Sequence, residues 1–236
     1  MVDRHFMSFI RKLSRILFQV ILLLACFSVY SQEKSRLDHF RDLSRPEKWW
    51  VLTHPFSASR ALEISLHARK VSEKLSQNPF LDADGRGGQI DAFRHAYWMA
   101  LLTQELNARR AWRLGYDHEK GNKLDHLNNK GTTSRWLPTE KDCTMDMFNN
   151  DAGIAIGLKY PDATREEMKN IIISKLLKGH FIILKKDDHG YLLDCAGNKI
   201  NRDHYFHSWE NPVCLVPSDY NSRAATAPFI KYFKPY

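Results

Sequence analysis

Apolar side chains recur at helical spacing through much of the chain. In residues 57–78 the apolar positions alternate in steps of three and four: Ala61, Ile64, Ala68, Val71 and Leu75. This spacing predicts an amphipathic helix, which Asn78-Pro79 ends. The preceding polar segment, residues 32–56, carries two adjacent tryptophans. We expect it to form a short helix or loop that packs its tryptophans on the body of the protein.

The same criterion predicts further helices over residues 89–106, 108–127 and 144–158. Thr164 and Glu167 form a capping-box pattern that starts another helix, and Gly179 closes it. Residues 181–195 contain two β-rich runs around a turn at residues 187–190, which predicts a β-hairpin. The expected fold is therefore mainly α: one compact helical domain over residues 32–236 with a small C-terminal β-hairpin.

The first 31 residues differ from the rest. A basic leader precedes an almost unbroken apolar run over residues 16–30, and Val29 and Ser31 suit cleavage after Ser31. This layout is typical of a secretory signal peptide. An uncleaved anchor is one alternative, although the run is shorter than the roughly 20 residues that a spanning helix needs. A lipoprotein anchored at Cys26 is a less favoured one. We expect an exported protein, periplasmic or secreted, which contacts the membrane only through this leader.

Net charge and cysteines add little to this. The formal charge is +8, of which residues 1–31 contribute +3, so about +5 remains for the mature chain. Such a mild basic bias suits an anionic envelope substrate, while the absence of a basic block gives no strong nucleic-acid signature. Of the three remaining cysteines, Cys195 and Cys214 could form a disulfide in an oxidising compartment. That all three are reduced and buried is equally open.

The helix predicted over residues 89–106 carries ionisable groups on its apolar side. Asp91, His95 and Trp98 fall at positions i, i+4 and i+7 of one stripe, and Arg94 lies beside it. Buried charge is costly unless it is paired or bound to metal. We therefore expect this stripe to meet polar groups from other helices.

Two other helical segments offer such groups. One contains the tandem His118-Glu119. The other carries a stripe at positions i, i+3, i+4 and i+7, formed by Asp146, Asn149, Asn150 and Gly153. Glycines on this helix cost about 1 kcal/mol each relative to alanine, so Gly153 and Gly157 indicate close approach of a neighbouring helix or of a ligand.

Three interpretations fit these stripes. In the first, His95 and His118 supply nitrogens and Asp146, with Asp91, supplies oxygens to a divalent metal, zinc before others, with water in an open position. Glu119 is then the general base that activates this water.

The second interpretation needs no metal. His95 acts as a general base oriented by Asp91, while Arg94 and Asn149 or Asn150 stabilise a developing oxyanion. In the third interpretation the same groups form a structural hydrogen-bond network that locks the helices together.

The stretch GGQIDAFRHAYWMALL, followed by DHE and then MDMFNNDAGIAIG, resembles a family of uncharacterised bacterial helical domains. The family pattern is D-A-F-R-H-A-Y-W, then A-H-E, then M-D-x-x-N-N-x-x-G, and the resemblance covers about residues 80–180. Such domains occur in secreted proteins and at the C-terminal ends of polymorphic toxins. The resemblance implies a shared polar set: Asp91, Arg94, His95, His118, Glu119, Asp146, Asn149 and Asn150. Asp117 departs from the pattern, which usually has a small residue there.

The toxin association implies an enzymatic activity against an envelope component or a cell. Together with export and mild basicity, it favours a hydrolase, metal-assisted in the first instance, that acts on phospholipid or another envelope ester or amide. Metal-assisted phosphodiester hydrolysis, including that of a nuclease, would use the same residues. The alternative is a non-enzymatic envelope or interaction domain whose polar cluster is structural.

Overall fold

The computed structural model describes residues 35–129, 137–201, 205 and 208–220. The chain divides into two compact units, Met1–Leu43 and Ser44–Tyr236. The described part of the first unit is helix α2 (Arg36–Asp42), which Ser35 caps. The expected signal peptide, with its alternatives of a membrane anchor or a lipoprotein at Cys26, lies outside the described residues. Among the helices that are described, none combines the length and the apolar character needed to cross a membrane.

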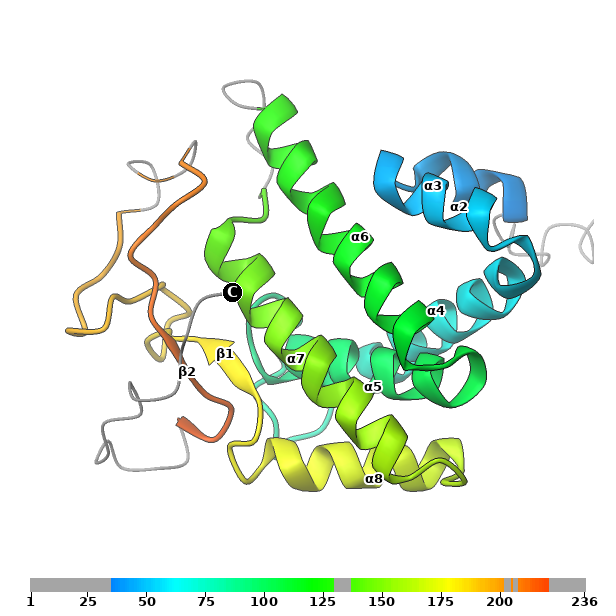
Figure 1. The fold of residues 1–236 in the computed structure, drawn as a ribbon. Helices are drawn as coiled ribbons and strands as arrows, with labels where there is room; N and C mark the ends of the chain where they lie inside the picture. The colour runs from blue at the N-terminus through cyan, green and yellow to red at the C-terminus, as the bar shows by residue number, and fades with distance from the viewer. Residues whose placement is uncertain (1–34, 130–136, 202–204, 206–207, 221–236) are drawn as a thin grey trace, which may run out of the picture. The chain divides into compact units, whose positions relative to one another are not determined.

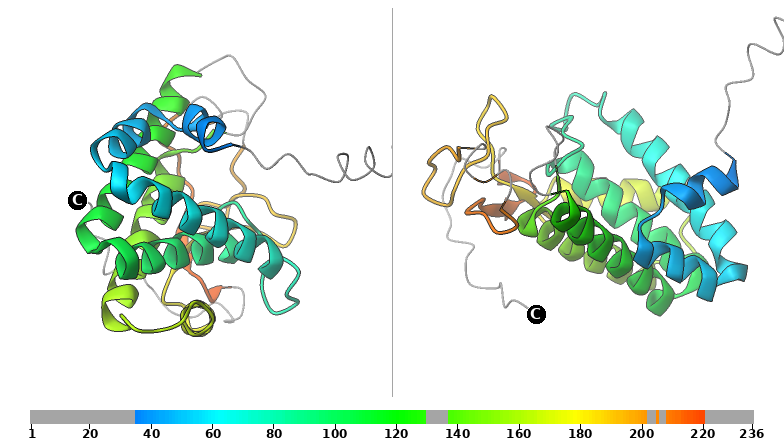
Figure 2. Two further views of the ribbon diagram at one scale, coloured as in Figure 1. Left: turned by 90° about the vertical axis from the view of Figure 1, so that its right-hand side faces the viewer. Right: turned by 90° about the horizontal axis from the view of Figure 1, so that it is seen from above.

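The described part of the second unit is built mainly from helices, as predicted (Figure 1). They are α3 (Arg45–Thr53), α4 (Pro55–Leu75), α5 (Gln89–Leu106), α6 (Ala108–Asn128), α7 (Glu140–Lys159) and α8 (Arg165–Leu176). Helix α5 is the centre of the core, since it packs against α4, α6, α7 and α8. Most of its residues are buried, including the fully enclosed Phe93 and Leu102. Figure 2 shows the same helices from two further sides.

Local sequence explains where two of these helices begin. The Thr164–Glu167 capping box predicted from the sequence starts α8. Helix α7 begins at Glu140, before the predicted start at residue 144. The reason is a second capping box, in which Thr139 and Asp142 bond reciprocally to each other's backbone amides. This extra turn places Asp142 and Cys143 on the helix that carries the Asp146 stripe.

Helices α5 and α7 share the most extensive contact among the described elements, and their backbones come close together. A Cβ added to Gly153 would lie 2.3 Å from the backbone oxygen of Ala96, and one added to Gly157 would lie 2.6 Å from that of Ala100. The glycines therefore let the two backbones touch, which confirms the expected approach of a neighbouring helix. Because Asp146 and Asn150 precede Gly153 on the same face, this contact carries them onto α5.

A small antiparallel sheet covers one end of α7. Strand β1 (Ile182–Leu184) pairs with β2 (Leu215–Pro217), with Ile183 opposite Val216. The strand thus starts where the hairpin over residues 181–195 was predicted, but its partner is different. The second run of the expected hairpin contributes only isolated bridges, from Leu192 to Lys186 and from Leu193 to Lys199. The turn at residues 187–190 does form, closed by backbone hydrogen bonding between Asp187 and Gly190.

Burial explains this change of partner. All three residues of β1 are buried, so β1 requires an apolar strand beside it rather than a solvated hairpin arm. A disulfide between Cys195 and Cys214 joins the loop after the turn to the segment leading into β2. It resolves the two alternatives left open for these cysteines, and Cys143 is free.

The residues after β2 fasten the sheet to the helices. The side-chain amide nitrogen of Gln89, at the start of α5, donates to the Ser218 carbonyl at 2.6 Å. The Ser218 hydroxyl donates to the Leu176 carbonyl at the end of α8, also at 2.6 Å. We call residues 213–220 the strap, because they tie the ends of two helices to β1.

Candidate metal centre

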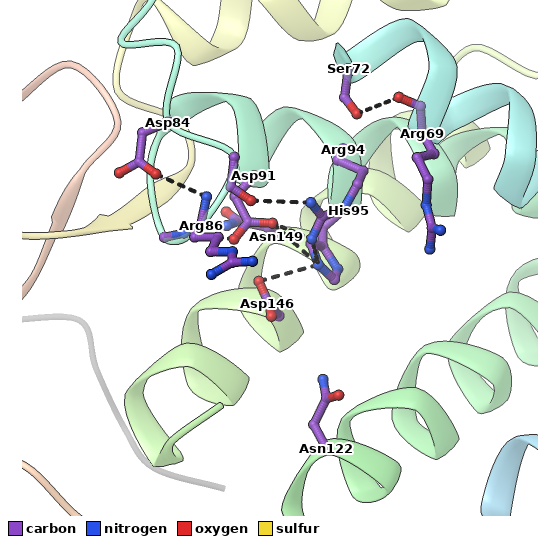
Figure 3. A network of polar contacts seen from close by, with 12 residues as sticks. Arg69, Ser72, Asp84, Arg86, Asp91, Arg94, His95, Asn122, Asp146 and Asn149 are labelled. Atoms are coloured by element: carbon purple, nitrogen blue, oxygen red, sulfur yellow. Dashed lines mark hydrogen bonds and ion pairs between the residues drawn. The ribbon is translucent and has the colours of Figure 1, made fainter. Parts of the chain in front are cut away.

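Asp91, His95 and Asp146 come together between α5 and α7 (Figure 3). One potential ligand atom from each lies within 4.8 Å of the others, and all three residues are buried. His95 Nε2 lies 3.4 Å from Asp146 Oδ1 and 3.6 Å from Asp91 Oδ1. This group could hold a metal ion, since two carboxylate oxygens and one imidazole nitrogen face a common point.

The other nitrogen of His95 is already engaged. Nδ1 lies 3.1 Å from Asn150 Oδ1 on α7. If Nδ1 carries the proton and donates it to this amide oxygen, the lone pair of Nε2 points at the two carboxylates. Burial, followed by the positive charge of Arg94, holds the pKa of His95 well below its usual value. His95 is therefore neutral at physiological pH, the form that binds metals.

The carboxylates lack the hydrogen bonds that buried charge requires. Asp91 Oδ1, Asp146 Oδ1 and Glu119 Oε1 are buried and accept no hydrogen bond from the described residues. Burial raises the pKa of all three groups. For Asp146 the negative charges of Asp91 and Glu119 raise it further. An unpaired buried carboxylate costs several kcal/mol. Arg94 forms an ion pair with Asp91, which leaves Asp146 and Glu119 without an Arg or Lys partner among the described residues.

The second oxygen of Asp91 is held from outside the cluster. The backbone N–H of Gly87 donates to Asp91 Oδ2 at 2.6 Å. Gly87 has a φ of +81°, and the Leu184 side chain fills the space where a Cβ would stand. The loop before α5 therefore needs glycine here, and in return fixes the orientation of Asp91. Outer hydrogen bonds of this kind are typical of metal ligands.

Arg94 brings the nearest positive charge. Its Nη2 contacts Asp91 Oδ1 and lies 3.1 Å from His95 Nε2, while Nη1 donates to the Gly85 carbonyl at 3.3 Å. About a third of its side chain is exposed, 34%. Arg94 thus lies at the solvent side of the centre and offsets part of its negative charge.

His118 lies next to this group but does not belong to the trio. Its ring centroid is 6.2 Å from that of His95, and its Nδ1 lies 2.8 Å from Glu47 Oε1. Burial lowers the pKa of His118, but the hydrogen bond with Glu47 and the charge of Glu119 outweigh it, so that the net shift is upward. Ser44 in turn donates to Glu47 Oε2 at 2.6 Å. The outcome is an oriented histidine, about a third exposed, beside the carboxylate cluster.

The remaining predicted residues divide into two groups. Glu119 belongs with the cluster, because its charge raises the pKa of Asp146 and its Oε2 accepts from Asn122 at 3.0 Å. Asn149 does not. Its amide bonds both the N–H and the carbonyl of Ile182, at 3.1 and 2.9 Å, and so fastens β1 to α7.

Sequence reasoning missed Glu47 as a partner of the site. Ser44 and Glu47 do show the capping-box spacing that starts α3. That pattern signals a helix start, and it says nothing of His118, which lies 71 residues away. The sequence also predicted His118 as a metal ligand together with His95 and Asp146. In the structure the residues close enough to share an ion are Asp91, His95 and Asp146.

The molecule is thus a mainly helical domain with a buried carboxylate–histidine cluster that could bind a metal ion. Residues 48–180 match the family model described as a domain of unknown function, DUF6973, and the chain belongs to this family. The match runs from within α3 to His180, two residues before β1, so it contains the whole cluster and His118 but begins one residue after Glu47. No curated protein and no solved structure matches the chain.

Proposed function

We propose that the protein is a hydrolase that depends on a divalent metal held by Asp91, His95 and Asp146. One observation carries this proposal. Two buried carboxylate oxygens, one from each aspartate, accept no hydrogen bond from the described residues and lie within 3.6 Å of a histidine nitrogen whose partner nitrogen is bonded elsewhere, and Arg94 pairs with only one of them, Asp91 Oδ1. A divalent cation at this point would satisfy all three atoms.

Charge supports the same assignment. With Asp91, Glu119 and Asp146 ionised, the cluster has a formal charge of −3, and Arg94 offsets only one unit of it. A divalent metal would neutralise the rest. The donor set of two carboxylates and one imidazole suits zinc, and its oxygen-rich character also suits manganese. Zinc is the first metal to test.

The surrounding residues suit hydrolysis. A bound divalent metal lowers the pKa of a coordinated water and so supplies a nucleophile near neutral pH. Glu119, with one oxygen that accepts no hydrogen bond from the described residues, would serve as the general base toward an attacking water. His118 is oriented by Glu47 and reaches the surface, so it donates a proton to the leaving group.

For the substrate we propose an envelope ester or phosphodiester, phospholipid among them. The mild positive charge of the chain and the resemblance to secreted and toxin-associated domains support an anionic envelope target. Export itself, through the leader of residues 1–31, belongs to the same proposal.

Metal content tests the centre. Residues 32–236 would be purified, dialysed against zinc or manganese, and measured by inductively coupled plasma mass spectrometry, alongside Asp146→Asn and a matched control, Asp151→Asn. Asp151 is exposed on the same helix. We expect about one equivalent of metal in the wild type and the control, and a large loss in Asp146→Asn. Equal metal content in all three proteins would refute the centre.

Activity tests the reaction. The metal-loaded protein would be assayed on phospholipid vesicles, on single-stranded and duplex nucleic acid, and on small chromogenic esters and phosphodiesters. His118→Gln should lower kcat at least a hundredfold and leave the metal content unchanged. If the protein binds metal tightly but turns over none of these substrates, the proposed metal centre stands and the proposed hydrolase activity is refuted.

Arg94 favours a second candidate, in which the cluster is purely structural. Its guanidinium lies beside Asp91 Oδ1 and His95 Nε2 and so places a protein cation at the point where the metal would bind. Turning the Asn150 amide would let His95 donate from Nε2 to Asp146 instead. In this case no metal binds, and His95→Ala lowers the free energy of unfolding by about 1–3 kcal/mol through unsatisfied partners.

A further inference from the structure

A concave region lies on the β side of the molecule, and none of the candidate metal ligands is among the residues that line it. It is a cavity of about 710 Å³, within the size range of small-molecule sites, roughly 300–1,000 Å³. Five segments line it: the loop before α5, the start of α7, the turn after β1, residues 199–201 with Tyr205, and the segment leading into β2. Cys195–Cys214 joins two of the surrounding loops.

Part of the wall of the cavity is aliphatic. Leu192, Ile200 and Val213 line it, and all three belong to a small hydrophobic cluster with Met145 of α7 and with Ile182 and Leu184 of β1. Leu137, which precedes α7, adds a further buried apolar side chain to the wall. An aliphatic wall of this kind contacts alkyl groups without leaving polar atoms unpaired.

The charged groups around the cavity are all basic. Arg86, Lys186 and Lys199 line it, with His189, and no aspartate or glutamate is among the lining residues. Lys186 is paired with Asp84, and Lys199 with Asp187 at 2.9 Å.

Arg86 differs from the two lysines. Within the described part of the chain its guanidinium makes no ion pair or hydrogen bond, and only its backbone bonds to Asp84 and Lys186. It is the cation that remains free to meet a ligand at the cavity.

We infer that this cavity binds a single-chain anionic amphiphile, with the alkyl chain along Leu192, Ile200 and Val213 and the acidic head at Arg86. A fatty carboxylate and an alkyl phosphate share this chemistry, and a guanidinium binds either head through paired hydrogen bonds. An aromatic anion fits less well, because Lys199 already covers one face of the Tyr191 ring at 4.4 Å from its centroid.

Two residues that line the cavity are close in sequence to residues of the candidate metal centre. Arg86 precedes Gly87, whose N–H holds Asp91, and Thr139 lines the cavity seven residues before Asp146 on α7. Seven helical residues span about 10 Å. Binding in the cavity does not require the proposed hydrolysis, although the two sites would share one ligand if the substrate is an acyl ester.

Displacement of a dansylated undecanoate by unlabelled amphiphiles tests the inference on residues 32–236. Laurate and dodecyl phosphate, each below its critical micelle concentration, separate the carboxylate from the phosphate source. Dodecyltrimethylammonium has the same chain with the opposite charge. We expect saturable displacement by at least one anion and at least tenfold weaker displacement by the cation. Equal displacement by anion and cation, or no saturable binding of the probe, would overturn the inference.

Two variants locate the ligand. Arg86→Gln should weaken anion binding about tenfold, the loss of one charged hydrogen bond, whereas Lys74→Gln on the exposed face of α4 should not. Ile200→Trp should fill the cavity and abolish binding, with the exposed Leu158→Trp as its control. Because Arg86 is exposed, its variant keeps the fold even if Ile200→Trp does not. Unchanged affinity in Arg86→Gln contradicts the inference.

Asp146→Asn separates this inference from the proposed function. It should abolish metal binding and leave amphiphile binding unchanged. If the metal centre fails its test, the cavity is still judged by its own displacement curves. Loss of amphiphile binding in folded Asp146→Asn would show that the probe sits on the carboxylate cluster, and would overturn the cavity assignment.

Discussion

His95 on α5 and Asn150 on α7 meet across the interface of the two helices, with His95 Nδ1 3.1 Å from Asn150 Oδ1. The next residue back, Asn149, points elsewhere and holds Ile182 of β1. The side-chain amides of these two adjacent residues therefore have different partners, since neighbouring side chains on a helix point about 100° apart. One orients a histidine, and the other attaches the sheet.

The two asparagines should separate experimentally. Asn150→Ala removes the partner that orients His95, so metal affinity should fall about 10–100-fold, as for other outer partners of metal ligands. Asn149→Ala should lower the free energy of unfolding by about 1–3 kcal/mol and leave metal affinity within a factor of about two. Metal titration and urea unfolding of both variants check this. The reverse pattern would mean that Asn150 is a structural residue.

Asp146→Asn should stabilise the metal-free protein. Burial and the charges of Asp91 and Glu119 raise the pKa of Asp146 well above its usual value, so its ionised form at neutral pH opposes folding. An uncharged amide removes this penalty, and we expect a gain of about 1–3 kcal/mol at pH 7 in EDTA. The gain should shrink as the pH falls toward about 4, where the unfolded carboxyl is also protonated. Asp151→Asn serves as control, and a loss of stability in Asp146→Asn would contradict the proposed charge imbalance.

Gly153→Ala should damage the α5–α7 contact. The added methyl group would lie 2.3 Å from the Ala96 carbonyl oxygen, a backbone atom that cannot move aside without shifting the helix. Overpacking of this kind costs about 1–3 kcal/mol or more. Gly85→Ala is the matched control, since nothing lies within 4 Å of its added methyl group, and should change stability by less than about 0.5 kcal/mol. Thermal unfolding of both variants measures the difference.

Glu47→Gln should destabilise the protein in a pH-dependent way. The pKa of His118 is raised in the folded state, so its contribution is complete below about pH 6.5 and is lost as the pH rises through the folded pKa. The pKa of Glu47 is lowered, so its contribution is present above about 4.5 and is lost on acidification. The variant should therefore lose most stability between about pH 4.5 and 6.5, on the order of 1 kcal/mol because His118 is a third exposed. A flat difference from pH 5 to 9 would mean that the pair is not ionic.

The helical framework was predictable because its signals are local. Apolar spacing predicts α4, α5, α6 and most of α7, and capping chemistry marks the start of α8. The polar stripe of α5 predicted that charged groups converge, and the structure brings Asp91, His95 and Asp146 together.

The rest could not be predicted because it depends on contacts between distant residues. The bond of His118 to Glu47 spans 71 residues, and no spacing in the sequence encodes it. The strand that pairs with β1 comes much later in the chain, after the turn at residues 187–190. That turn, in which the Gly190 N–H donates to the Asp187 carbonyl, is itself typical of a hairpin. Only the burial of all of β1 against α7 decides in favour of Leu215–Pro217.

The strap has a consequence for biogenesis. A chain is synthesised from its N-terminus, so α3 to α8 emerge from the ribosome before residues 213–220. Until these residues arrive, Gln89 and Leu176 lack their Ser218 partner, and Cys195 lacks the thiol with which it pairs. The residues that could hold a metal ion are therefore synthesised before the segment that closes the β side. The disulfide and the hydrogen bonds of Ser218 are thus contacts that the chain can form only after the helices have been made.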